Sequence, residues 1–213
     1  RTSGSSAYGS ENRFAPMWSF GLGWNLHKER FMRGTAVSLL KLRASIGYVG
    51  NAGFSPYQAQ LAYQYSSDLL YNGSIGAVPV SMVNPRLKWE RSLKRNFGVD
   101  FGFWNDRVNG SADIYYDTTN DLVMTFAKPD HIGFSNAKEN LGKIRNKGFE
   151  LTISSRNISH KNFQWTTDLV FSTNRLMVID DGGERIDLGN NAIAEAGKPW
   201  GSFFVLNRLG TWG

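Results

Sequence analysis

The clearest pattern in this chain of 213 residues lies in the stretch Leu93-Lys94-Arg95-Asn96-Phe97-Gly98-Val99-Asp100-Phe101-Gly102-Phe103. Its odd-numbered positions are apolar except for Arg95, and its even-numbered positions are polar or glycine. Successive side chains of a β-strand point to opposite faces of the sheet. A period of two therefore predicts a strand with one apolar face and one polar face.

The same alternation recurs along the chain, and no segment shows a convincing helical period. Six further segments show it: 14–26, 40–48, 108–118, 144–156, 163–173 and 202–208. Most of these strands run for 11 to 13 residues. Strands of soluble proteins usually have about 5 to 6 residues, whereas a tilted membrane-spanning strand needs about 9 to 11. The strand lengths predict an all-β fold, an antiparallel transmembrane β-barrel with about seven strands in this chain.

The connections between these strands alternate between short and long. The short ones are 105–107 and 157–162, and the long ones are approximately 51–89, 119–143 and 174–201. Outer-membrane barrels have short periplasmic turns and long extracellular loops, so we expect the three long connections outside the cell. Lipid cannot satisfy an open sheet edge, and single-chain bacterial barrels have an even number of strands. Seven strands cannot close, so residues 1–213 are expected to be part of a larger barrel domain.

The two faces of the predicted strands suit two different surroundings. The apolar face is expected to meet lipid, with aromatic rings forming a girdle at the membrane boundary. The candidates for this face are Trp18, Phe20, Trp24, Phe97, Phe101, Phe103, Tyr116 and Trp165. The opposite face would line the lumen, with candidates Lys41, Arg43, Asp100 and Asp113. These charges are mixed in sign, so no charge class of cargo is favoured.

Composition excludes several classes of function. The net charge is +6 and the sequence pI about 9.6, but the basic residues are scattered over separate segments, so nucleic acid is not expected as a partner. The chain has no cysteine, and its three histidines lie in three different connections. No Ser/His/Asp arrangement and no set of metal ligands can be placed. We therefore predict no catalytic residue, no metal site and no cofactor.

Two other interpretations share the alternating pattern. A soluble β-sandwich at the cell surface, binding carbohydrate through aromatic platforms, also has alternating strands. Sandwiches usually place a turn every 8 to 12 residues, however, which these longer strands and loops do not. A passive porin is the other interpretation. An amino-terminal plug encoded by the same gene would separate a transporter from a porin.

Several stretches carry more specific motifs. The most specific is Asn84-Pro85-Arg86-Leu87-Lys88-Trp89-Glu90, followed by Gly98-Val99-Asp100-Phe101-Gly102-Phe103. Others are Leu42-Arg43-Ala44-Ser45-Ile46-Gly47, the segment from Asn140-Leu141-Gly142 to Lys147-Gly148-Phe149-Glu150-Leu151, and Gly197-Lys198-Pro199-Trp200-Gly201-Ser202-Phe203-Phe204. In order and spacing, these motifs resemble the SusC/RagA family of TonB-linked outer-membrane transporters of Bacteroidetes-type bacteria. The resemblance covers nearly the whole chain.

This resemblance implies a barrel of about 22 strands with an amino-terminal plug in its lumen. Residues 1–213 would belong to the carboxy-terminal half of the barrel, without the plug or the segment that contacts TonB. The resemblance also implies import of a nutrient, an oligosaccharide or a peptide, across the outer membrane, with a SusD-like lipoprotein covering the barrel from outside. Aromatic residues of the long connections are candidates for contact with that lid: Tyr57, Tyr63, Tyr65, Tyr71 and Phe134.

Overall fold

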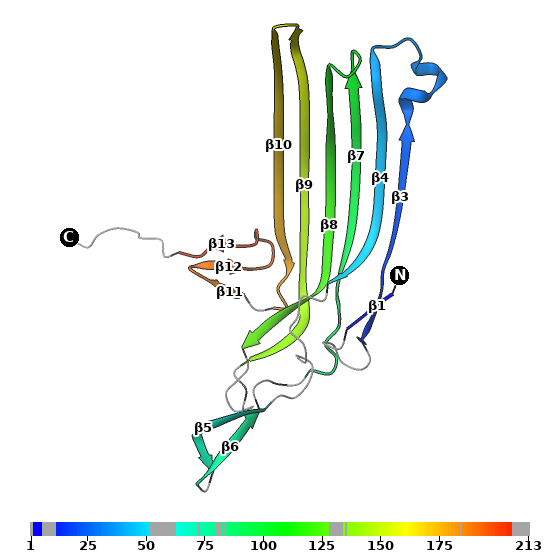
Figure 1. Cartoon of the computed structure of the whole chain (residues 1–213). Helices are drawn as coiled ribbons and strands as arrows, with labels where there is room; N and C mark the ends of the chain where they lie inside the picture. Colours follow the sequence, from blue (N-terminus) through cyan, green and yellow to red (C-terminus); the bar gives the residue numbers. More distant parts are fainter. Residues whose placement is uncertain are drawn as a thin grey trace, which may run out of the picture.

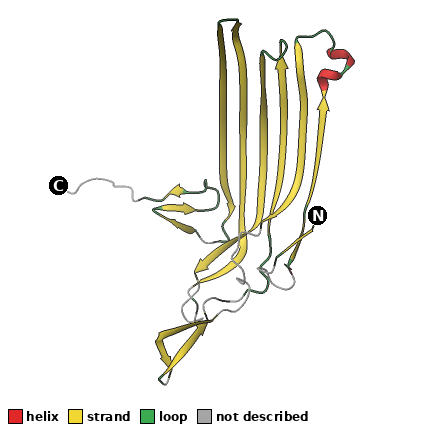
Figure 2. Ribbon diagram, viewed as in Figure 1, coloured by secondary structure: helices red, strands yellow, loops and turns green. Residues whose placement is uncertain are grey.

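The computed structural model is dominated by one antiparallel sheet (Figures 1 and 2). It describes residues 2–5, 12–51, 63–71, 73–79, 82, 84–127, 134, 136–183 and 185–205. The sheet has six strands in the order β10-β9-β8-β7-β4-β3. Their bounds are β3 Trp18–Asn25, β4 Val37–Asn51, β7 Glu90–Phe103, β8 Val108–Ala127, β9 Asn136–His160 and β10 Phe163–Asp180. The prediction of an all-β, antiparallel fold is confirmed.

Each strand of this sheet lies beside the strand of the sheet that precedes or follows it in sequence. β4 and β7 are also neighbours, although their connection contains a separate hairpin of β5 (Tyr63–Tyr71) and β6 (Ser74–Pro79). Two short turns, residues 104–107 and 161–162, lie at the end of the sheet opposite to this hairpin (Figure 1). The long and short connections therefore lie at opposite ends of the sheet.

The tight β7–β8 turn has an unusual backbone. Trp104, Asn105 and Asp106 have φ angles of 53°, 56° and 60°. Asn and Asp adopt this left-handed conformation more readily than most residues, which suits them to so short a turn.

Two short 3-10 helices, η2 (Leu26–Lys28) and η3 (Arg30–Met32), join β3 to β4. No helix among the described residues is both long enough and apolar enough to cross a membrane.

Register gives the sheet two distinct faces. Phe97 pairs with Ala44 on β4 and with Ile114 on β8, whereas its neighbour Gly98 pairs with Arg43 and Asp113. The apolar face is the side that carries Phe20, Leu42, Phe97, Ile114, Phe149 and Phe171. The polar face is the side that carries Gly21, Arg43, Asp100, Asp113, Thr152 and Ser172.

Several strands extend beyond the alternating segments. β8 continues to Ala127, β9 begins at Asn136 and β10 continues to Asp180, so much of the predicted connection 119–143 and the start of 174–201 is strand. Backbone pairing between β8 and β9 continues past register shifts near Thr119 and Leu122. Ladder hydrogen bonds join backbones and do not require alternating side chains, which is why the pattern underestimates strand length.

The predicted seventh strand, 202–208, does not join the large sheet where it is described. Ser202–Phe203 is β13, which pairs with β12 (Ala192–Ala194), and β12 pairs with β11 (Ile186–Gly189). Residues 206–208 lie outside the described residues. The chain leaves the large sheet after β10 through Gly182 and Gly183, whose φ angles of 75° and 88° favour glycine. A further small sheet pairs β1 (Thr2–Gly4) with β2 (Phe14–Pro16).

Burial is sparse across the described residues. A small cluster of Ala15, Leu87 and Trp89 is buried near the start of β7. On the apolar face, by contrast, large side chains such as Phe20 and Leu169 remain more than half exposed. A contiguous exposed apolar surface of this kind marks a face that meets a partner or a membrane.

Candidate functional site

The polar face carries a charge network that joins three strands. Arg43 on β4 donates from Nε to Asp100 Oδ2 at 2.9 Å and from Nη2 to Asp100 Oδ1 at 2.8 Å. The same Nη2 donates to Asp113 Oδ2 on β8 at 3.0 Å. The planar guanidinium fork suits such a two-pronged contact with a carboxylate. We call these three side chains the polar-face network.

Gly98 makes room for this network. It lies on β7 between Arg43 and Asp113 in the register. A Cβ at this position would fall against Asp113 Oδ1 and lie 2.8 Å from Arg43 Nη2. The network therefore depends on a residue without a side chain at its centre.

The structure brings together three of the four predicted lumenal residues. Arg43, Asp100 and Asp113 form one network, as described above. Lys41 lies on the same face and pairs in register with Asp100, but no ion pair joins it to another described residue. With Lys41 included, the four side chains carry two positive and two negative charges, and Glu150 on β9, which pairs in register with Asp113, adds a third negative charge to this part of the polar face.

The predicted girdle residues share the apolar face. The register between neighbouring strands places all eight on this side: Trp18, Phe20, Trp24, Phe97, Phe101, Phe103, Tyr116 and Trp165. Several rings lie close together, with ring centroids 5.8 Å apart for Trp18 and Tyr48 and 6.0 Å apart for Phe101 and Phe103. Aromatic rings thus meet both between β3 and β4 and along β7.

At the start of β7, the Asn140 side chain links two of the sequence motifs, the segment 84–90 and the segment that begins at Asn140 itself. Its Nδ2 donates to the carbonyls of Lys88 at 2.7 Å and Asp121 at 2.8 Å, and its Oδ1 accepts from the Lys88 backbone N–H at 2.9 Å. Leu87, one residue away, is fully buried. These bonds fasten the 84–90 segment to β8 and β9.

Glu90 connects the same segment to β4 and, a second time, to β8. It is 7% exposed, and its carboxylate accepts from Asn51 Nδ2 at 2.8 Å and from the Val123 backbone N–H at 3.1 Å. We call residues 84–90, with Asn51 and Asn140, the 84–90 clamp. The most specific motif of the sequence thus has a structural role that residue spacing did not indicate, because its partners come from other strands.

Asp121 adds two ion pairs beside the 84–90 clamp. Its Oδ1 lies 2.8 Å from Lys88 Nζ and its Oδ2 lies 2.7 Å from Arg91 Nη2. Asp121 lies outside the membrane-spanning part of β8, because the preceding residues 108–118 are by themselves long enough to cross a membrane. Burial by itself would raise the pKa of the Asp121 carboxyl, but hydrogen bonds from Lys88 and Arg91 lower this pKa below its usual value. Asp121 is therefore ionised at neutral pH.

The candidates for lid contact are only partly described. Tyr63 and Tyr65 lie in β5 and are 57% and 76% exposed. Tyr71 ends the same strand, although its side chain is outside the described part, and Phe134 is half-buried. Tyr57 lies outside the described residues. The structure therefore places two exposed aromatic rings on the hairpin between β4 and β7.

Within the described ranges, no group of three or more His, Cys, Asp or Glu side chains is placed to hold a metal ion. The polar-face network, the aromatic apolar face and the 84–90 clamp are the features that define this sheet. A sheet of long antiparallel strands with one apolar and one polar face is the wall of an outer-membrane type of β-barrel.

Comparison with known proteins agrees with this class. The family described as "TonB dependent receptor-like, beta-barrel" matches residues 1–204. The chain belongs to this family of TonB-dependent receptors.

Several relatives can be named. TonB-dependent receptor P39 of Formosa agariphila is 32% identical over 211 residues, which are 99% of this chain and 20% of that protein. TonB-dependent receptor SusC of Bacteroides thetaiotaomicron is 29% identical over 230 residues, covering 98% of this chain and 23% of SusC. The solved structure of the RagAB peptide transporter matches with a TM-score of 0.83 and 27% identity, over 94% of this chain and 22% of that chain.

The chain spans about a fifth of the length of the relatives that it matches. The resemblance to the SusC/RagA family is confirmed, and so is the location in the bacterial outer membrane. TonB-dependent receptors are transport proteins and not enzymes. The interpretation as a soluble β-sandwich is wrong, because the six long strands form part of a barrel wall.

Proposed function

We propose that this chain forms part of the barrel wall of an outer-membrane importer that takes up an oligosaccharide or a peptide and draws its energy from TonB. The single observation that carries the proposal is the sheet with two chemically distinct faces, one aromatic and exposed and one polar with the Arg43–Asp100–Asp113 network. An apolar outer band and a polar interior are what a membrane barrel needs. The similarity to SusC and to the RagAB peptide transporter supports the same function.

The polar face would line the path of the cargo. Its charges are mixed in sign, and its strands also carry small and hydroxylated residues such as Ser111 and Thr152. Such a surface offers hydrogen bonds without attracting one sign of charge strongly. It suits oligosaccharides and peptides, which are polar over their whole length, better than an ion of one charge.

Uptake by the living bacterium tests the proposal. Deletion of the gene should abolish uptake of the labelled oligosaccharide or peptide on which the strain grows, and the intact gene should restore it. Depletion of TonB should abolish the same uptake. Uptake that continues after TonB depletion would identify a passive porin and contradict the proposal.

A SusD-like lipoprotein is the proposed partner at the outer end. The β5–β6 hairpin lies at the end of the sheet opposite to the short turns, and Tyr63 and Tyr65 are exposed on it. Exposed aromatic rings are enriched where proteins bind one another. The hairpin would therefore contact the lid.

A capture experiment tests the contact with the lid. In the whole protein, Tyr63→Ala/Tyr65→Ala should reduce co-purification of the lipoprotein several-fold. Trp165→Ala, which removes an exposed ring from the apolar face, serves as the control and should leave capture unchanged. Equal capture by both variants would exclude the hairpin as the docking site.

A further inference from the structure

A cluster of basic side chains surrounds Tyr116 on the apolar face. Arg95 on β7 and Arg145 on β9 flank this ring from its two neighbouring strands. Their Cζ atoms lie 5.5 Å and 5.4 Å from the centroid of the Tyr116 ring. A guanidinium over a ring face at this distance is attracted by the negative face of the ring. One tyrosine therefore holds two arginines near each other.

Two more cations extend the cluster across the sheet. Lys147 pairs in register with Tyr116, and Arg175 on β10 pairs with Lys147. Side chains of cross-strand partners share a face, so both cations lie on the side of Tyr116. The four residues of the basic cluster are Arg95, Arg145, Lys147 and Arg175.

No carboxylate neutralises this cluster in the described part of the chain. None of its four cations forms an ion pair with a described residue. Arg145 Nε is buried and has no hydrogen-bond partner there. Arg43 on the polar face offers the contrast, because two aspartates bind it. Like charges gathered without a counter-charge repel one another, and an anion from outside the chain would relieve this repulsion.

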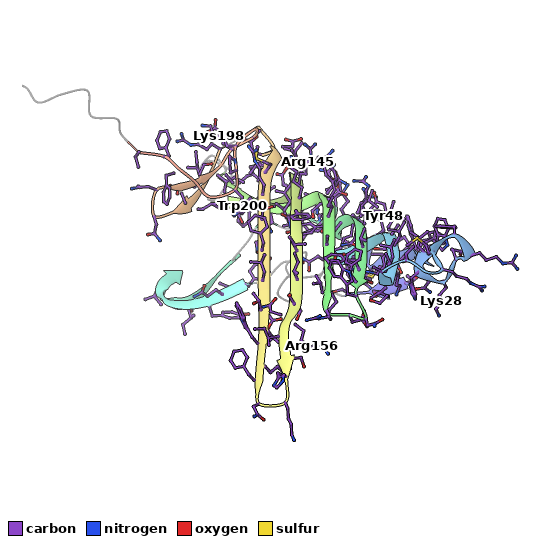
Figure 3. All side chains as sticks on the ribbon, turned by 90° about the horizontal axis from the view of Figure 1, so that it is seen from above. Lys28, Tyr48, Arg145, Arg156, Lys198 and Trp200 are labelled. Carbon is purple, nitrogen blue, oxygen red and sulfur yellow. The ribbon has the colours of Figure 1, made fainter. Side chains whose placement is uncertain are left out.

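The position of the cluster indicates what kind of anion this is. The next row of the apolar face contains Phe97, Ile114 and Phe149, so the cluster borders the apolar band directly. It also lies away from the short turns: Figure 3 labels Arg145 and Arg156 toward opposite ends of β9, and the β9–β10 turn follows the Arg156 end. Long basic side chains at such a boundary reach from the hydrocarbon to the headgroups.

We infer that the basic cluster binds the phosphate of a lipid headgroup in the outer leaflet of the membrane. Arginine forks bind phosphate oxygens in pairs, and Tyr116 holds two forks on one side of the sheet. The acyl chains of the same lipid would lie along the adjacent apolar rows. The inference rests on the proposed function, in which the apolar face points to lipid.

Lipid binding by the purified whole protein tests the inference. The protein is extracted from outer membranes in detergent, mixed with dioleoyl phosphatidic acid or dioleoyl phosphatidylcholine, and analysed by native mass spectrometry. The two lipids share their chains and differ in headgroup charge. We expect the natural protein to prefer phosphatidic acid about tenfold. Arg95→Gln/Arg145→Gln should abolish this preference.

Matched variants separate the site from the total charge. Lys94→Gln/Lys161→Gln removes one charge from the polar face and one from the short β9–β10 turn. This variant should keep the full preference for phosphatidic acid. Arg95→Lys/Arg145→Lys retains both positive charges and should keep at least half of the preference for phosphatidic acid. An unchanged preference in Arg95→Gln/Arg145→Gln overturns the inference. Displacement of phosphatidic acid by an equal concentration of inorganic phosphate overturns it as well, because the ligand would then be a free anion.

Uptake measured on the same variants separates the two proposals. Uptake that depends on the gene and on TonB, together with unchanged lipid preference in Arg95→Gln/Arg145→Gln, overturns the lipid site alone. Loss of lipid preference in that variant, together with uptake that ignores TonB, overturns the proposed import mechanism alone.

Discussion

Arg43 and Asp100 form a two-pronged ion pair across neighbouring strands, with Nε to Oδ2 at 2.9 Å and Nη2 to Oδ1 at 2.8 Å. The two side chains are 35% and 25% exposed, so water reaches both. Asp113 shares the Nη2 donor from the next strand. Two carboxylates thus depend on one guanidinium to offset their mutual repulsion.

Removing the cation should expose this dependence. Arg43→Gln leaves Asp100 and Asp113 on one face without the cation that both of them bind, and we expect the free energy of unfolding of the whole barrel in lipid vesicles to fall by about 1 kcal/mol. Asp100→Asn in the Arg43→Gln background should recover part of the loss, because one negative charge is gone. Urea unfolding of Arg43→Gln, of Asp100→Asn and of the double variant measures the coupling energy between the two side chains. A coupling energy of zero would mean that solvent screens the pair completely.

Adding a methyl group at Gly98 should disturb the same network. Gly98→Ala places the Cβ against Asp113 Oδ1 and the Arg43 guanidinium. These ends of side chains must shift and weaken their partly exposed ion pairs, so we expect a loss of about 1 kcal/mol. Gly21→Ala on the same face is the control, because its Cβ would lie 3.8 Å from the Ala44 carbonyl oxygen and 3.9 Å from Ser45 Cβ, which are ordinary contacts. Equal thermal unfolding of the two variants would contradict the crowding at Gly98.

Two neighbouring residues on β10 can test which face meets lipid. Leu169 and Val170 are 53% and 74% exposed and lie on the apolar and polar faces respectively. Arginine on the lipid face at the membrane midplane costs about 2 to 4 kcal/mol. Leu169→Arg should therefore lower the yield of folded barrel in the outer membrane strongly, whereas Val170→Arg should change it little. The reverse result would assign the apolar face to the lumen.

The 84–90 clamp should be sensitive to one amide. Asn140→Ala removes all three hydrogen bonds between this side chain and the backbone of Lys88 and Asp121, and we expect a loss of about 1 to 3 kcal/mol. Protease cleavage near residues 84–90 should also become faster, because the segment loses its anchor. Asn174→Ala is the control, since this asparagine is exposed on β10 and no hydrogen bond joins its side chain to a described residue. Equal cleavage rates in the two variants would show that the segment is held by other contacts.

Sequence reasoning predicted the strands and their two faces well. Alternation over Leu93–Phe103 places Phe97 and Asp100 on opposite faces of the sheet, and the register of β7 with β4 and β8 confirms this placement. It was less successful at boundaries, where β8 and β9 continue into the predicted connection 119–143. Backbone hydrogen bonds extend a ladder without needing alternating side chains, so composition alone does not mark where it ends.

The sequence by itself determined the all-β class and the division into apolar and polar faces, because the period of two follows from local backbone geometry. Only the tertiary structure decided which side chains meet. Arg43 and Asp100 are 57 residues apart in sequence, and Asn140 reaches Lys88 over 52. The arginines around Tyr116 come from two different strands. Such contacts depend on strand order and register, which are set by pairing between distant segments and not by the pattern within any one of them.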